Sequence, residues 1–163
     1  MRKIIMMAAG AAALSASPAF AATDTDDMLV TATVIDNCTV TASPMAFGTL
    51  TTLGTANIDS SATIALACTP DAAYDVSLDL GLNAGVGTQR ELVNGADSTQ
   101  RIPYDVYTDA ARTAGWSSGA GNTVAGTASG GVATLTAYGR IPATASSVTS
   151  GSYSDSVTVT VTF

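Results

Sequence analysis

The sequence predicts an all-β protein built as an antiparallel sandwich, on two observations. Thr, Val, Gly, Ser and Ala dominate after the first 21 residues, and leucines never recur at the spacing of three to four that an amphipathic helix needs. Short stretches instead place apolar side chains at every second position, between breaks of Gly, Pro, Asn and Asp. Such alternation is typical of sheets that bury one face, and it favours an antiparallel β-sandwich.

The most regular alternation is SVTVTVTF, at 156–163, whose odd-numbered residues are apolar, and YDVSLDL, at 74–80, alternates in the same way with apolar even-numbered and polar odd-numbered residues. Similar stretches follow one another along the chain, and each is expected to form a strand. In order, the expected strands are 28–35, 38–42, 62–68, 74–80, 102–107, 132–138 and 153–163.

The breaks between these strands carry turn residues. Residues 81–88 and 93–99 are expected to be turns, and the Asn94-Gly95 dipeptide inside the second is a strong turn signal. Residues 115–131 are rich in Gly, Ser and Ala, which predicts a long, mobile connection holding at most a short hairpin. No repeat and no second domain is apparent.

The first 21 residues have the features of a secretory signal peptide. Two positive charges precede an apolar stretch too short to span a bilayer comfortably, and Ala19 and Ala21 form the Ala-x-Ala pattern of a cleavage site. We therefore predict export, a mature chain of 22–163, an N-terminal strand segment at 22–36 and a β-sandwich domain at 37–163.

The charge of the mature chain limits its partners. Four arginines against thirteen acidic residues give a net charge of −9 once Arg2 and Lys3 are removed. A surface of this sign repels phosphate backbones, and no basic cluster with interleaved aromatic residues is present, so nucleic acid is not expected as a partner.

Cys38 and Cys68 are the only cysteines. In an exported chain they are expected to form a disulfide, because the compartments outside the cytoplasm are oxidising. The alternative, a metal site, needs further ligands of the right type, and the chain contains no histidine.

The sequence offers little for catalysis, and no catalytic, cofactor-binding or metal-binding residue is predicted. Residues 115–119, GWSSG, match the Gly-x-Ser-x-Gly pattern of serine hydrolases, but there is no histidine to accept the serine proton and no helix is expected to follow. Trp116 has two interpretations. We expect it to cap one end of the sandwich core, and the alternative is a residue that stacks on carbohydrate.

Several stretches, taken in order, carry a resemblance to a known family. An alternating N-terminal strand is followed closely by NCTV, and a Gly-x-Tyr-x-Asp precedes the final alternating strand. The matching stretches are NCTV (37–40), FGTL (47–50), IALAC (64–68), YDVYTDAARTAGW (104–116), YGRIPA (138–143) and GSYSDSVTVTVTF (151–163). The chain resembles the spore coat protein U domain family, which includes pilin subunits of archaic, Csu-type chaperone–usher pili.

This resemblance implies an incomplete immunoglobulin-like sandwich that lacks one strand, together with an N-terminal donor strand that fills the gap in the next subunit. The implied donor residues are Met28, Val30, Ala32 and Val34. The implied groove beside the C-terminal strand is edged by Val157, Val159, Val161 and Phe163.

The implied function is that of a structural subunit of a biofilm or adhesion pilus, exported to the periplasm and then displayed at the cell surface. The implied partners are a periplasmic chaperone, an outer-membrane usher and other pilin subunits. From alternation alone, the N-terminal strand could equally be an ordinary edge strand that folds back on its own sheet. The alternative function is a stand-alone secreted module, either a coat component or a carbohydrate- or surface-binding domain using Trp116 and the 115–131 loop.

Overall fold

The structure is a computed structural model that describes residues 20–85 and 87–163. The chain divides into two units after Thr33. The described part of the first unit, residues 20–33, is exposed and contains no strand or helix. The second unit, residues 34–163, contains every strand. The predicted signal peptide falls almost wholly on residues 1–19, which lie outside the described residues.

Within the described ranges the second unit has nine strands and one short 3-10 turn, and no α-helix. The strands are β1 (Cys38–Ala42), β2 (Ile58–Cys68), β3 (Ala73–Leu78), β4 (Arg90–Asn94), β5 (Arg101–Tyr107), β6 (Val124–Thr127), β7 (Val132–Ile141), β8 (Tyr153–Ser154) and β9 (Val159–Thr162), with η1 at Ser129–Gly131. None of the described residues forms a helix of the length and apolarity needed to cross a membrane.

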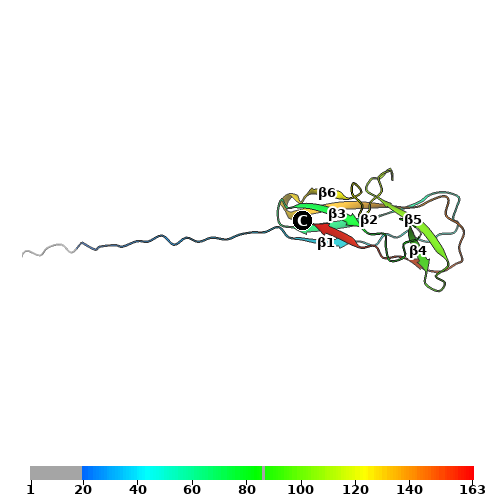
Figure 1. The fold of residues 1–163 in the computed structure, drawn as a ribbon, viewed down its shortest axis with the longest axis horizontal. Coiled ribbons are helices and arrows are strands. Elements are labelled where there is room, and N and C mark those ends of the chain that lie inside the picture. Colours follow the sequence, from blue (N-terminus) through cyan, green and yellow to red (C-terminus); the bar gives the residue numbers. More distant parts are fainter. Residues whose placement is uncertain (1–19, 86) are drawn as a thin grey trace, which may run out of the picture. The chain divides into compact units, whose positions relative to one another are not determined.

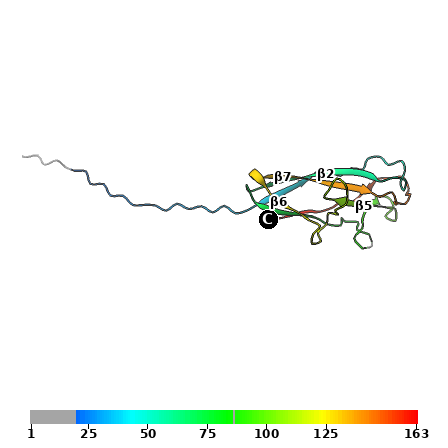
Figure 2. The ribbon, with the colours of Figure 1, turned by 90° about the horizontal axis from the view of Figure 1, so that it is seen from above.

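The strands form two antiparallel sheets. The larger has the order β1-β2-β7-β5-β4-β8 and the smaller the order β6-β3-β9. The longest ladder joins β2 to β7, from the pair Ile58–Ile141 to the pair Ala67–Val132, and the two strands run side by side in Figure 2. In Figure 1, β9 is the red strand that ends at the C-terminus beside β3. The predicted all-β antiparallel sandwich is confirmed.

The core forms between the two sheets from the alternating positions. On β2, Ile64 and Leu66 are buried while the residues between and beside them are exposed. Val76 and Leu78 of β3 face them from the smaller sheet, in the same cluster of buried side chains. Trp116 is 1 % exposed and its indole N–H donates to the carbonyl of Val76 at 2.9 Å. The expectation that Trp116 caps the core is therefore confirmed, and it is not available for stacking on carbohydrate.

Four strands differ from the sequence-based expectation. The expected strand at 28–35 is not formed, and these residues are exposed and pair with no other strand of the described chain. β4 was not expected, because its buried end residues are the polar Arg90 and Asn94, which hide the apolar alternation. β6 lies inside the 115–131 connection and pairs with β3, so much of that connection is ordered. The expected final strand, 153–163, is interrupted between β8 and β9, for a reason given below.

Cys38 and Cys68 form the predicted disulfide. The two residues are direct partners in the β1–β2 ladder, so the bond joins neighbouring strands at the end of the larger sheet. It ties the first strand of the domain to the end of β2, 30 residues along the chain.

We predict that loss of this disulfide lowers the free energy of unfolding by roughly 3–4 kcal/mol, because a loop of this length is no longer closed in the unfolded chain. The measurement is urea unfolding of the oxidised protein and of a Cys38→Ala, Cys68→Ala double variant. Reductant should shift the midpoint of the wild type and leave the double variant unchanged. Equal stability of the two proteins would contradict the prediction.

Candidate functional site: an apolar groove between two free sheet edges

Each sheet ends in a strand with one free edge. Among the described residues, β1 pairs with β2 alone and β9 pairs with β3 alone. The Cα atoms of β1 and β9 come within 8 Å of each other, yet no ladder joins the two strands in the described chain. The side of the sandwich between β1 and β9 therefore presents unpaired backbone N–H and C=O groups, which is the arrangement that accepts an additional strand.

A cavity of about 340 Å³ opens between these two edges. One wall comes from the end of β1 and the loop after it, and includes Ala42 and Met45. The opposite wall comes from Val157 and Val159, at the start of the final strand. Core side chains form the floor: Ile64, Leu78, Tyr104, Val106 and Ala137. The cavity thus reaches down to buried core side chains beside the start of β9, and we call it the groove.

The four predicted groove residues lie on one side of the terminal strand. Val157, Val159 and Val161 are half-buried and pack against the core, while the residues between them are exposed. Phe163 is 53 % exposed. The alternation therefore points the valines inward, and the groove lies beside two of them.

Asp79, which follows β3, binds the chain just before β9. Its carboxylate accepts hydrogen bonds from the backbone amides of Thr158 at 2.7 Å and Gly81 at 2.9 Å. Desolvation acts to raise the pKa of Asp79, but the hydrogen bonds from Thr158 and Gly81 outweigh it and the pKa lies below its ordinary value. The backbone amide of Asp79 in turn donates to the carbonyl of Thr158 at 3.0 Å. The expected final strand is interrupted because its first part, β8, pairs with β4 in the larger sheet, whereas β9 pairs with β3 in the smaller one.

A cluster of hydrogen-bonded polar side chains lies beside the groove, and two of its members, Tyr104 and Asp155, line it. The Tyr104 hydroxyl donates to Asp155 at 2.7 Å, and the backbone amide of Asn83 donates to the same carboxylate at 3.1 Å. Burial, and then the bond to Asp155, raise the pKa of Tyr104, so its hydroxyl stays protonated at neutral pH. The buried Arg90 guanidinium donates to the carbonyls of Asp79 and Trp116. These contacts link the start of the terminal strand to β3, β4 and β5.

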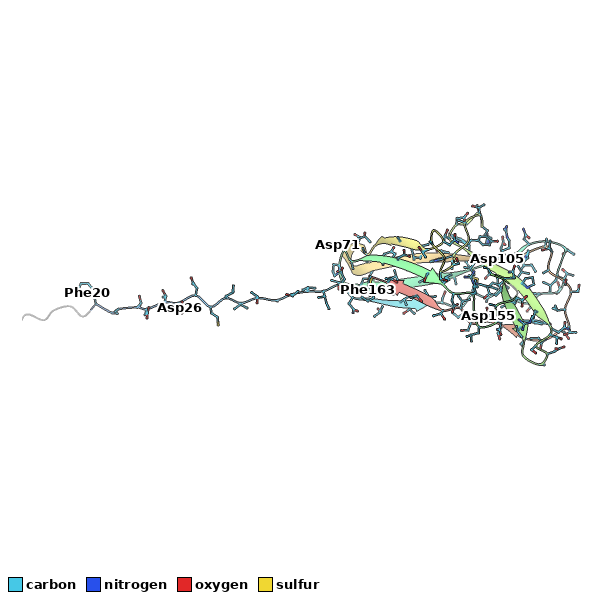
Figure 3. All side chains as sticks on the ribbon, in the orientation of Figure 1. Phe20, Asp26, Asp71, Asp105, Asp155 and Phe163 are labelled. Atoms are coloured by element: carbon cyan, nitrogen blue, oxygen red, sulfur yellow. A yellow bond between two sulfur atoms is a disulfide. The ribbon has the colours of Figure 1, made fainter. Side chains whose placement is uncertain are left out.

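The predicted donor residues lie in an exposed part of the chain. Met28 is 85 % exposed, Val30 79 % and Val34 81 %, and Ala32 is exposed as well. The neighbouring Leu29 and Ile35 are also exposed, which alternation had not singled out. No ladder involves residues 20–37, so the donor assignment stays a prediction. Figure 3 shows side chains along this extended segment, with Phe20 and Asp26 labelled.

The described residues offer no alternative chemical site. The Gly-x-Ser-x-Gly match at 115–119 lies in a loop and is followed by no α-helix within the described chain. No group of three or more His, Cys, Asp and Glu side chains gathers there to hold a metal ion. No role was predicted for Asp79, and Asp155 entered only as the last residue of the Gly-x-Tyr-x-Asp pattern, because the roles of both depend on partners that are distant along the chain.

Comparison with known proteins agrees with the geometry. Residues 24–160 match the family model of the Spore Coat Protein U domain. The match covers most of the chain, and the protein belongs to this family, which is a family of structural subunits and not of enzymes. No curated protein matches the chain significantly.

The fold resembles a chain in the crystal structure of the CsuC–CsuE chaperone–tip adhesion subunit pre-assembly complex, from the archaic chaperone–usher Csu pili of Acinetobacter baumannii. The two chains are 25 % identical, with a TM-score of 0.57, and the match covers 80 % of this chain and 40 % of the Csu chain. This chain therefore spans less than half the length of the Csu chain. A chain in a structure of the chaperone–tip adhesin complex of CFA/I fimbriae matches at 12 % identity and a TM-score of 0.41, over 65 % of this chain and 35 % of that one. No conclusion about fold or function is based on this weaker match.

We predict that Asp79→Asn lowers the stability of the domain at neutral pH, because the charged acceptor for Thr158 and Gly81 is lost. The folded-state pKa of Asp79 lies below 3.8, so the wild-type advantage should be full above that pH and fall away as the pH drops further. The measurement is the urea midpoint of both proteins between pH 7 and pH 2.5. Asp24→Asn, in the exposed segment, serves as the control and should not shift the midpoint. A difference between Asp79→Asn and the wild type that does not depend on pH would contradict this role.

Proposed function

We propose that this protein is a structural subunit of a cell-surface pilus, assembled by donor-strand complementation through a chaperone–usher pathway. The main support for the proposal is that one chain contains two features that each lack a partner. One is an apolar groove beside a free strand edge, and the other is an exposed, alternating apolar segment with no partner strand. Each feature supplies what the other lacks.

The N-terminal segment has the physical character of a strand that is buried in assembly. Exposed side chains such as Met28, Val30 and Val34 leave large apolar surfaces in water. Burying each of them would contribute roughly 1.5–3 kcal/mol. Asp24, Asp26 and Asp27 precede these residues and would keep the segment soluble before it is buried.

The groove supplies the complementary surface. A strand laid along β9 would satisfy its unpaired backbone groups, with each ladder hydrogen bond contributing about 0.5–1.5 kcal/mol. Its inward side chains would reach the cavity floor formed by residues such as Ile64 and Leu78. An interface that combines these contributions would be long-lived, as a fibre requires.

The partners follow from this mechanism. A periplasmic chaperone would fill the groove first, an outer-membrane usher would present the subunit for assembly, and the N-terminal segment of the next pilin would replace the chaperone. Membership of the Spore Coat Protein U domain family and the likeness to a chain of the Csu chaperone–subunit complex support this reading. The chain would pass through the periplasm and reside on the cell surface, where such a pilus would serve adhesion and biofilm formation.

We predict that Val30→Asp slows polymerisation of the full-length protein at least about tenfold. The reason is that insertion of the segment would bury a charge in the apolar groove without a partner. Thr31→Asp is the matched control: it adds the same charge one residue along, on the opposite face of the strand. The measurement is the rate of fibre formation, followed by size-exclusion chromatography and electron microscopy.

Equal effects of the two substitutions would show that charge alone, and not insertion of Val30, controls assembly. Deletion of residues 22–35 gives a second test. A deletion variant that remains folded and still forms fibres at the wild-type rate would overturn the donor-strand proposal.

A further inference from the structure

The chain that links the N-terminal segment to β1 is held by a single residue, Thr69. The Thr69 hydroxyl donates to the carbonyl of Ile35 at 3.1 Å and accepts the backbone N–H of Asn37, also at 3.1 Å. The backbone amide of Thr69 donates to the carbonyl of Asn37 at 2.8 Å. We call Ile35–Asn37 the root of the segment. Both hydrogen bonds of the Thr69 side chain, and the one donated by its backbone amide, are made with this root, while its carbonyl accepts the amide of Ala72.

These bonds hold the root as a continuation of β1. Cys38 and Cys68 are the end pair of the β1–β2 ladder, and Asn37 and Thr69 are the next residues along each strand. Among the described residues, only Asp71 and Arg112 have a positive φ without being glycine. Asp36 and Asn37 are therefore not in the conformation of a tight hairpin turn, which requires positive φ.

The root lies at the end of the sandwich where β9 finishes. The turn after Thr69 leads directly into β3, and β9 runs antiparallel to β3, with Thr162 opposite Asp75 near the start of β3. Figure 3 shows Asp71 and Phe163 at this same end of the domain. A segment entering the groove of its own chain would therefore have to reverse direction within the root.

Such a reversal conflicts with the bonds to Thr69. A hairpin through Asp36 and Asn37 would place Ile35 beside Cys38, on the free edge of β1 that faces away from β2. The carbonyl of Ile35 instead reaches Thr69, which follows β2. The two arrangements exclude each other, whereas a strand from another molecule enters the groove without any turn.

We propose that Thr69 determines which segment fills the groove: by holding the root straight, it disfavours the chain's own segment and leaves the groove to a second copy. This inference rests on the proposed donor-strand function. It makes Thr69 a positioning residue, which acts on the groove through the root and not by contact with the donor.

The test measures binding of a fluorescent peptide of residues 22–36 to full-length protein at nanomolar concentration, by anisotropy. The Val30→Asp protein, whose own segment cannot insert, gives the affinity of an open groove. The wild type and the Thr69→Ser variant, which keeps the hydroxyl, are expected to match it. Thr69→Val, which loses two hydrogen bonds, is expected to bind the peptide about tenfold more weakly, because its own segment now competes.

The double variant Thr69→Val, Val30→Asp separates competition from damage to the fold. Restored peptide binding in this protein supports competition by the chain's own segment. Peptide affinity that stays low in the double variant, or that is unchanged in Thr69→Val alone, overturns the role of Thr69.

Two further outcomes distinguish this inference from the proposed function. A wild type that binds far more weakly than Val30→Asp would mean that the segment enters its own groove despite Thr69, which overturns the inference and leaves donor-strand complementation standing. A Val30→Asp protein that does not bind the peptide would overturn the proposed function itself, and the inference with it.

Discussion

The backbone of β9 has hydrogen-bond partners on one side only, and the rest of the structure is arranged around that edge. β3 satisfies one side of the strand, while the other side borders a groove whose floor is the hydrophobic core. A free edge of this kind is a liability in water unless another strand covers it. In the proposed assembly, the exposed apolar segment near the N-terminus of another subunit would cover this edge; within the described chain that segment has no partner strand.

Polar side chains, and not only apolar packing, define the groove. The Asp79 carboxylate accepts the amide of Thr158 just before β9, and Asp155 accepts the hydroxyl of the buried Tyr104. Arg90 joins these elements through carbonyl oxygens in a region with little access to water. Buried polar groups are tolerated because each has a partner, and such a cluster favours one geometry for the start of β9. The disulfide joins the start of β1 to the end of β2, and β1 reaches the groove at its other end, Ala42.

Much of the fold could be predicted from the sequence, and the exceptions have physical causes. Strands such as β2, β3 and β5 follow from alternation, because each buries one face. β4 could not be predicted, because its buried Arg90 is a charged residue whose partners are carbonyls 11 and 26 residues away along the chain. The break before β9 was hidden because the chain changes sheet there: β8 pairs with β4 and β9 pairs with β3, and alternation does not record which strand is the partner.

The sequence by itself determined the two faces of strands such as β2, β3 and β5, the pairing of Cys38 with Cys68 and the apolar alternation of 28–35 and 156–163, because these depend on local alternation and on residue type. Only the tertiary structure decided that β9 has a free edge beside a cavity, and that Thr69 holds Ile35 and Asn37 in line with β1. Such features arise from residues that are distant in sequence and adjacent in space, and a one-dimensional pattern does not record which strand edges remain unpaired.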